Sequence, residues 1–175
     1  MAHGLNFEDV VARHYESLYR FAFSLTRAEA ESADLTQQTF YVWATKGKSL
    51  RDQTKVKSWL FTTLHRQFLE TRRKQNRFPH HEIQAVDHEL PSVSPRATNA
   101  SDANQVLLAL TQLDETYQAP VVLFYLEDYA YKEIAGILDL PMGTVKSRIS
   151  RGIRQLQEQL GHPRAQVKPR QKETP

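Results

Sequence analysis

Four basic side chains and no acidic ones lie in the short stretch 143–154. At about 100° per residue on a helix, Arg151 and Arg154 fall opposite an apolar stripe, with Arg148 on the flank. Lys146 lies nearer that stripe, but its long stem carries the charge outward. A basic helix face is commonly only solvated, yet a face that serves solubility alone normally mixes both signs of charge. The absence of acids therefore favours binding to nucleic acid.

The elements that must position these side chains are two helices and a turn. In the second helix, apolar residues recur at spacings of three and four: Val145, Ile149, Ile153, Leu156 and Leu160. A shorter helix precedes it, with Ile134, Ile137 and Leu138 as its apolar face, and Asp139-Leu140-Pro141 interrupts the pattern. Two short helices, a tight turn and a basic second helix are typical of a helix-turn-helix.

A second basic region lies earlier in the chain. Residues 46–77 carry ten Lys and Arg against two acids, whereas residues 78–128 carry one Arg against eight acids. A solvated surface of no consequence is the alternative, but the excess in the first block makes it the weaker one. The alternating blocks indicate two nucleic-acid-facing regions separated by an acidic spacer.

Hydrophobic periodicity predicts an all-α fold of two small helical domains joined by a flexible linker, with the helix-turn-helix in the second. Helices are expected over residues 7–25, 30–45, from 58 to the basic end near 77, and 103–113. Residues 46–57 read as an exposed basic loop. Pro120 either restarts a helix or kinks it. The expected domains are 6–77 and 102–160, with an acidic linker over 78–101 and a disordered basic tail over 161–175.

Several classes of protein and site are disfavoured. The chain has no Cys, which excludes disulfides, thiolate metal sites and a Cys nucleophile. No apolar run approaches the length of a membrane span, and the N-terminus lacks the pattern of a signal peptide. No phosphate loop or HExxH motif supports an enzyme, and no cofactor is expected. The linker histidines could suggest a metal, but without Cys solvation is the better reading: His80, His81 and His88.

The segments YKEIA at 131–135 and GTVKSR at 143–148 resemble the promoter-binding region of bacterial RNA polymerase sigma factors of the extracytoplasmic-function (ECF) group. Asp139 stands where that family often has Gly, and Ala130 where it often has a capping Ser. Neither change touches the DNA-facing side. The resemblance implies that the −35 element is contacted by Thr144, Lys146, Ser147, Arg148, Ser150 and Arg151.

The first half of the chain carries two further resemblances. VKSWLFTTLHRQFLETRR at 56–73 is similar to the family segment that melts and holds the −10 element. DLTQQTF at 34–40 is similar to its polymerase-binding segment, with Gln38 in place of the usual Glu. The implied −10 contacts are Lys55, Lys57, Trp59, Arg66 and Arg73, although spacing predicts Trp59 as a core residue first. The implied polymerase contacts are Asp34, Gln37, Gln38 and Phe40.

Together these features predict a promoter-specificity subunit with no active site of its own. The resemblance implies core RNA polymerase, promoter DNA and an anti-sigma factor as partners, and a cytoplasmic location. A free-standing helix-turn-helix regulator is the alternative: it explains residues 102–160 but leaves the basic block and the SWLFTTL segment unexplained. Co-purification with core polymerase separates the two readings.

Overall fold

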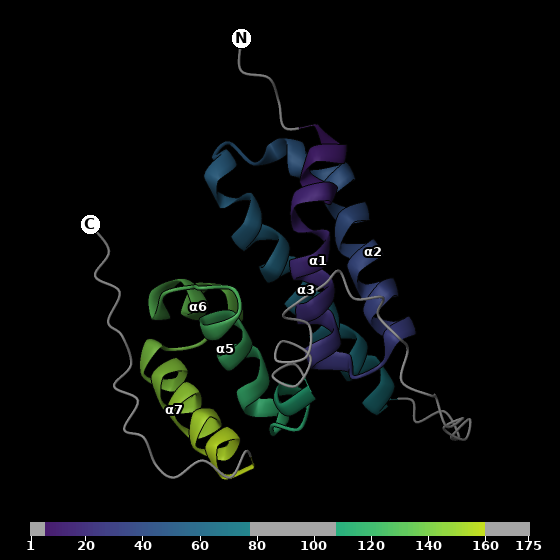
Figure 1. Ribbon diagram of the computed structural model, residues 1–175. Helices are drawn as coiled ribbons and strands as arrows, with labels where there is room; N and C mark the ends of the chain where they lie inside the picture. The colour runs from purple at the N-terminus through teal and green to yellow at the C-terminus, as the bar shows by residue number, and fades with distance from the viewer. Residues whose placement is uncertain (1–5, 78–107, 160–175) are drawn as a thin grey trace, which may run out of the picture.

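The computed structural model of the chain describes residues 6–77 and 108–159. Within these two ranges the secondary structure is helical, with no strand. One group of helices comes from the first range and stands beside a second group from the other (Figure 1). The prediction of an all-α fold is therefore confirmed. The expected linker 78–101 and tail 161–175 lie outside the described residues, as do the three linker histidines.

The first group contains three long helices: α1 (Phe7–Thr26), α2 (Glu29–Lys46) and α3 (Val56–Arg77). The side chain of Asn6 caps the start of α1 by accepting the N–H of Glu8 at 3.4 Å. The helix ends at Arg27, whose left-handed backbone lets its N–H bond to the carbonyl of Phe23. The core between the helices is apolar and fully buried, and it includes Leu18, Phe21, Leu60, Phe61 and Leu64.

The connection between α2 and α3 is more ordered than the exposed loop expected from the sequence. Two short 3₁₀ helices occupy it, at Gly47–Ser49 and Gln53–Lys55. Gly47 lies against the indole of Trp43, and a Cβ at this position would come within 2.5 Å of the ring. Most of this connection is exposed, as expected, but Gly47 and Val56 are buried, and the ring of Trp43 leaves no room for a side chain at position 47.

The second group contains α5 (Glu115–Tyr125), α6 (Tyr131–Leu138) and α7 (Met142–Gln159). Of the helix expected over 103–113, only residues from 108 onward are described, and Leu110 and Leu113 are buried there. Pro120 lies inside α5 rather than at its first turn, so the helix does not restart at this residue. Both Pro120 and Val121 are buried, and α5 packs against α6 and α7.

The two groups contact each other, α1 against α5 and α3 against α6. Arg27 in the first group donates a hydrogen bond to the carbonyl of Leu113 in the second, at 2.8 Å. Arg72 on α3 pairs with Glu115 at the start of α5. The surfaces that the sequence assigns to DNA must therefore be located relative to this interface.

Candidate nucleic-acid interface

The turn before α7 sets the direction in which its basic face points. Asp139 adopts the left-handed conformation, with φ 55° and ψ 51°, and its N–H bonds to the carbonyl of Ala135. The N–H of Leu140 bonds to the same carbonyl at 3.0 Å, which closes the end of α6. Asp is among the few residues that accept this backbone conformation, so it can stand in for Gly at this turn.

The start of α6 compensates for its missing capping side chain. Ala130 occupies the N-cap position and has no side-chain acceptor. The carboxylate of Glu133 accepts the N–H of Ala130 at 2.8 Å, which is half of the reciprocal pair in a capping box. The unfilled half leaves the helix start weaker than a Ser-capped one, but it does not change the placement of α7.

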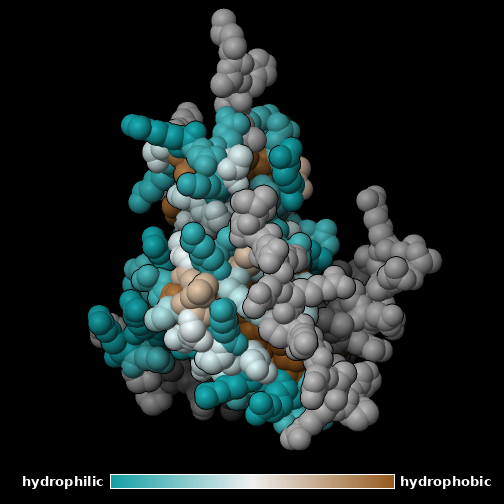
Figure 2. Space-filling model, turned by 90° about the vertical axis from the view of Figure 1, so that its left-hand side faces the viewer, coloured by the Kyte–Doolittle hydropathy of each residue, from teal (hydrophilic) through white to brown (hydrophobic). Residues whose placement is uncertain are grey.

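The apolar stripe of α7 is buried and its basic face is not. Val145 and Ile149 are fully buried, whereas Ile153 and Leu156 are partly covered. Figure 2 views the molecule from the left-hand side of Figure 1, where α6 and α7 lie, and that face is mostly hydrophilic, with small hydrophobic areas between. Among the predicted −35 contacts, Lys146, Ser147, Ser150 and Arg151 are exposed, and Thr144 and Arg148 are half-buried.

Two polar side chains at the start of α7 have defined positions. The Oγ of Ser147 donates to the carbonyl of Thr144 at 3.0 Å, so this hydroxyl stays close to the helix and adds little bulk to its surface. The ammonium of Lys146 lies 5.8 Å from the ring centre of Tyr131. The ring holds the charge beside the polar face, as expected for a lysine whose Cα lies near the apolar stripe.

The predicted −10 residues are distributed along α3 and the 3₁₀ turn that precedes it. Lys55, Arg66 and Arg73 are exposed. Trp59 is half-buried and packs edge-on against Trp43, with ring centres 5.3 Å apart, so its position agrees with the prediction of a core residue. Lys57 differs from the others, because its ammonium is engaged by the second helical group.

The predicted polymerase segment divides between the two faces of α2. Asp34, Gln37 and Gln38 are exposed together, whereas Phe40 is only 5% exposed and belongs to the core. Because Phe40 is buried, a partner protein can reach only Asp34, Gln37 and Gln38 among the four predicted contacts. Sequence reasoning did not select Tyr41, which is 71% exposed next to Phe40. A large aromatic residue on an otherwise polar face was the signal for it.

Other buried or close-packed residues were also missed. Glu127 is buried although it carries a charge, and Gly152 faces α5 so closely that a Cβ would lie 2.6 Å from a methyl carbon of Val121. His65 on α3 has a pKa lowered to about 4 by burial. Within the described ranges no cluster of three or more acidic or histidine side chains could hold a metal ion, and no helix there could cross a membrane.

This geometry defines a class of protein with two helical groups, each carrying a basic surface, and a helix-turn-helix in the second. The Sigma-70 region 2 family matches residues 10–78, and the Sigma-70 region 4 family matches residues 103–156. Both regions occur in the order that the sequence motifs indicated.

Relatives that match most of the chain are sigma factors of one group. SigM of Mycobacterium tuberculosis (strain H37Rv), an ECF RNA polymerase sigma factor, is 30% identical over 157 residues, which is 89% of this chain and 78% of that protein. SigM of Bacillus subtilis is 27% identical, covering 87% of this chain and 93% of the relative. SigE of Mycolicibacterium smegmatis is 28% identical over 89% of this chain, but the chain spans only 62% of the length of SigE.

A solved structure matches as well. The sigma factor RpoE from Bartonella quintana, in complex with the anti-sigma factor NepR, superposes with a TM-score of 0.72 at 27% identity, covering 90% of this chain and 98% of that one. The chain belongs to the ECF group of RNA polymerase sigma factors, the promoter-specificity subunits of the bacterial enzyme.

Proposed function

We propose that this sigma factor docks on core RNA polymerase through α2, holds the opened −10 element along α3, and reads the −35 element with α7. The placement of two basic surfaces on two separate helical groups carries the proposal. One long helix could not present both surfaces to promoter elements that lie apart on the DNA. The two domains, 6–77 and 102–160, divide the work accordingly, and the acidic stretch between them acts as the linker.

The polymerase contact rests on the polar side of α2. Asp34, Gln37 and Gln38 are exposed side by side in the segment that resembles the family's docking site. Changing Asp34 to Arg reverses one charge in this surface without touching the core. We expect core affinity to fall roughly tenfold, which is about 1.4 kcal/mol, while helicity is unchanged.

Glu31→Arg is the matched control for this substitution. It makes the same charge change at an exposed position of α2, one turn before the docking segment. Equal losses for both variants would mean that the core enzyme responds to general charge, and unchanged binding of Asp34→Arg would remove α2 from the proposed contact.

The function as a whole is tested by transcription in vitro. The purified chain is added to core polymerase with a pool of genomic templates, and transcript starts are mapped. We expect starts downstream of a shared pair of promoter elements. DNA binding without co-purification of core polymerase would instead support the free-standing helix-turn-helix regulator.

Two further features of the proposal concern the setting of the chain. We infer that it works in the cytoplasm, on chromosomal promoters, and that it has no active site of its own. We also infer that an anti-sigma factor restrains it, because the similar RpoE from Bartonella quintana was solved in complex with one. A pull-down from the native host that recovers polymerase and no other stable partner would argue for control by expression level.

A further inference from the structure

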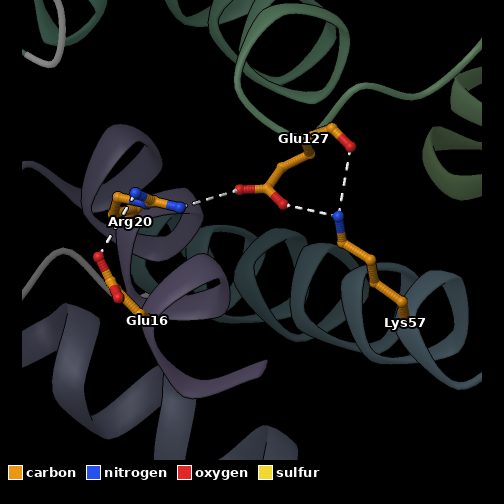
Figure 3. A network of polar contacts seen from close by, with 4 residues as sticks. All are labelled: Glu16, Arg20, Lys57 and Glu127. Carbon is orange, nitrogen blue, oxygen red and sulfur yellow. Dashed lines mark hydrogen bonds and ion pairs between the residues drawn. The ribbon is translucent and has the colours of Figure 1, made fainter. Parts of the chain in front are cut away.

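A buried carboxylate joins the two helical groups. Glu127 follows the last turn of α5, and its side chain is only 3% exposed. Figure 3 shows the carboxylate pointing toward the first group, between Arg20 on α1 and Lys57 on α3. Its Oε2 lies 3.0 Å from the Nζ of Lys57, and its Oε1 lies 3.9 Å from a guanidinium nitrogen of Arg20.

Lys57 is held by more than this one ion pair. Its ammonium also donates to the backbone carbonyl of Glu127 at 3.2 Å. The ring centres of Tyr129 and Phe61 lie 5.1 Å and 5.7 Å from the same nitrogen. A carboxylate, a carbonyl and two ring faces therefore contact this one ammonium, and three of these groups belong to the segment after α5.

Lys57 is also one of the residues assigned to the single-stranded −10 element. A lysine ammonium binds DNA through the phosphate oxygens, and it has a limited number of N–H donors to offer. In this structure the ammonium donates one hydrogen bond to the carbonyl of Glu127 and forms an ion pair with its carboxylate. The carboxylate thus engages the ammonium in the way that a phosphate oxygen would.

We propose that Glu127 is an internal substitute for promoter phosphate, so that packing of the second helical group on the first and binding of −10 DNA by Lys57 exclude each other. The inference rests on the proposed −10 role of α3. Opening of the two groups would not newly expose Lys57 and Arg20, whose side chains are already 36% and 42% exposed, but it would release both cations from their anionic partner.

The interface has features of a contact made to be released. Three buried polar atoms have no hydrogen-bond partner within the described ranges: Arg20 Nε, Glu127 Oε1 and the hydroxyl of Tyr129. Unsatisfied buried polar atoms oppose packing, because water would satisfy them in the open arrangement. The other polar cross-contacts include the hydrogen bond from Arg27 to the carbonyl of Leu113. They also include the pair of Arg72 with Glu115, whose side chains are 45% and 62% exposed and which therefore contributes little.

The first measurement is the distance between the two groups in the full chain. Because the sequence has no Cys, Glu31→Cys and Glu158→Cys place one dye on each group without competing sites. We expect Glu127→Gln to lower the energy transfer between the dyes, because the neutral amide binds the two cations more weakly. Lys57→Met breaks the same pair from the other side and should have the same effect.

Glu115→Gln is the matched control. It removes the charge of another acid at the interface, one that pairs with Arg72 and not with Lys57. We expect little change in energy transfer for this variant. Tryptophan fluorescence and helicity confirm that each variant is folded before the distances are compared.

The second measurement is affinity for a labelled thymidine oligonucleotide of about 12 nucleotides. We expect Glu127→Gln to raise affinity about fivefold, because a larger fraction of the protein is open. The gain should vanish in the double variant Glu127→Gln Lys57→Ala. Unchanged energy transfer in both Glu127→Gln and Lys57→Met would overturn the proposal, and so would a gain in affinity that does not depend on Lys57.

These results are separate from the test of function. If the wild-type chain supports no transcription with core polymerase, the proposed sigma function is wrong, regardless of the energy transfer measured between the dyes. If transcription succeeds and the Glu127 variants neither open nor bind DNA better, only the internal substitution for phosphate fails.

Discussion

The basic surfaces of α7 and α3 are similar in composition but differ in what surrounds them. On α7, the guanidinium groups of Arg151 and Arg154 are exposed and form no ion pair within the described ranges. On α3, Lys57 and Arg72 are both paired with acids of the other helical group. A count of basic residues treats these surfaces as equivalent, whereas in the structure the α7 surface is directly accessible and two cations of the α3 surface are paired across an interface.

The largest effect is expected from acid, which should destabilise the first helical group more than the second. Burial lowers the pKa of His65 to about 4, and burial next to Arg13 and Lys57 lowers the pKa of His14. A histidine whose pKa is lowered by burial binds its proton at a lower pH in the folded protein than in the unfolded chain. The free energy of unfolding therefore falls as the pH falls from about 6.5 toward 4. At about pH 5 we expect His65 to cost the first group about 2 kcal/mol.

Both tryptophans of the chain, Trp43 and Trp59, lie in the first group. Urea unfolding followed by tryptophan fluorescence at about pH 8 and pH 5 therefore reports that group alone. In His65→Gln the difference in the free energy of unfolding between the two pH values should be smaller than in the unchanged protein. A fall that is just as large in this variant would show that another group binds the proton.

The accessible helix should respond sharply to a single substitution. Arg151 lies at the centre of the outer face of α7, so we expect Arg151→Ala to cost about 1–3 kcal/mol and to alter preference at one or two base pairs. Lys146→Ala and Arg148→Ala, on the flanks, should weaken all promoters about equally and reduce the salt slope by about one each. Promoter binding by the holoenzyme is measured across a −35 library at several salt concentrations.

Equal losses on every sequence for Arg151→Ala would mean that this side chain grips phosphate. The bases would then be read by another residue or through the shape of the DNA.

The packing that supports the accessible face is tested at Gly152. A Cβ there would lie 2.6 Å from a methyl carbon of Val121 and 3.0 Å from the Cβ of Tyr117. Overpacking costs about 1–3 kcal/mol, while replacing a helical Gly by Ala returns about 1 kcal/mol. We expect a net loss of about 1 kcal/mol for Gly152→Ala in the second group.

Gly136→Ala is the control, because no atom lies within 4 Å of a Cβ built at that position of α6. It should be neutral or stabilising. Helicity during thermal unfolding reports both variants, and a Gly152→Ala protein as stable as Gly136→Ala would show that α5 and α7 adjust without cost.

The smallest effect is expected from the exposed pair at the interface. Arg72 and Glu115 are half exposed, so Arg72→Ala should change the free energy of unfolding by only about 0.5 kcal/mol. Arg73→Ala, one residue further along α3, provides the comparison for charge loss without this partner. A loss above about 2 kcal/mol for Arg72→Ala would contradict the assignment of the main polar contact to Glu127.

The sequence by itself determined the helices and the face that each one buries. Val145, Ile149, Ile134 and Ile137 recur at helical spacing, and burial follows that spacing because it places them on one side. The turn at Asp139 was also readable, since few residues accept the conformation that ends α6 there. The candidate −35 residues followed from the same periodicity and from the family motif.

Only the tertiary structure decided what happens to charges that meet across the chain. Glu127 and Lys57 are separated by many residues, and no local pattern marks either as a partner of the other. The close approach of Gly152 to Val121 likewise depends on how α5 and α7 cross. Periodicity describes which side of one helix is buried, but the neighbour of a side chain depends on how separate helices pack, and that arrangement is settled by the whole core at once.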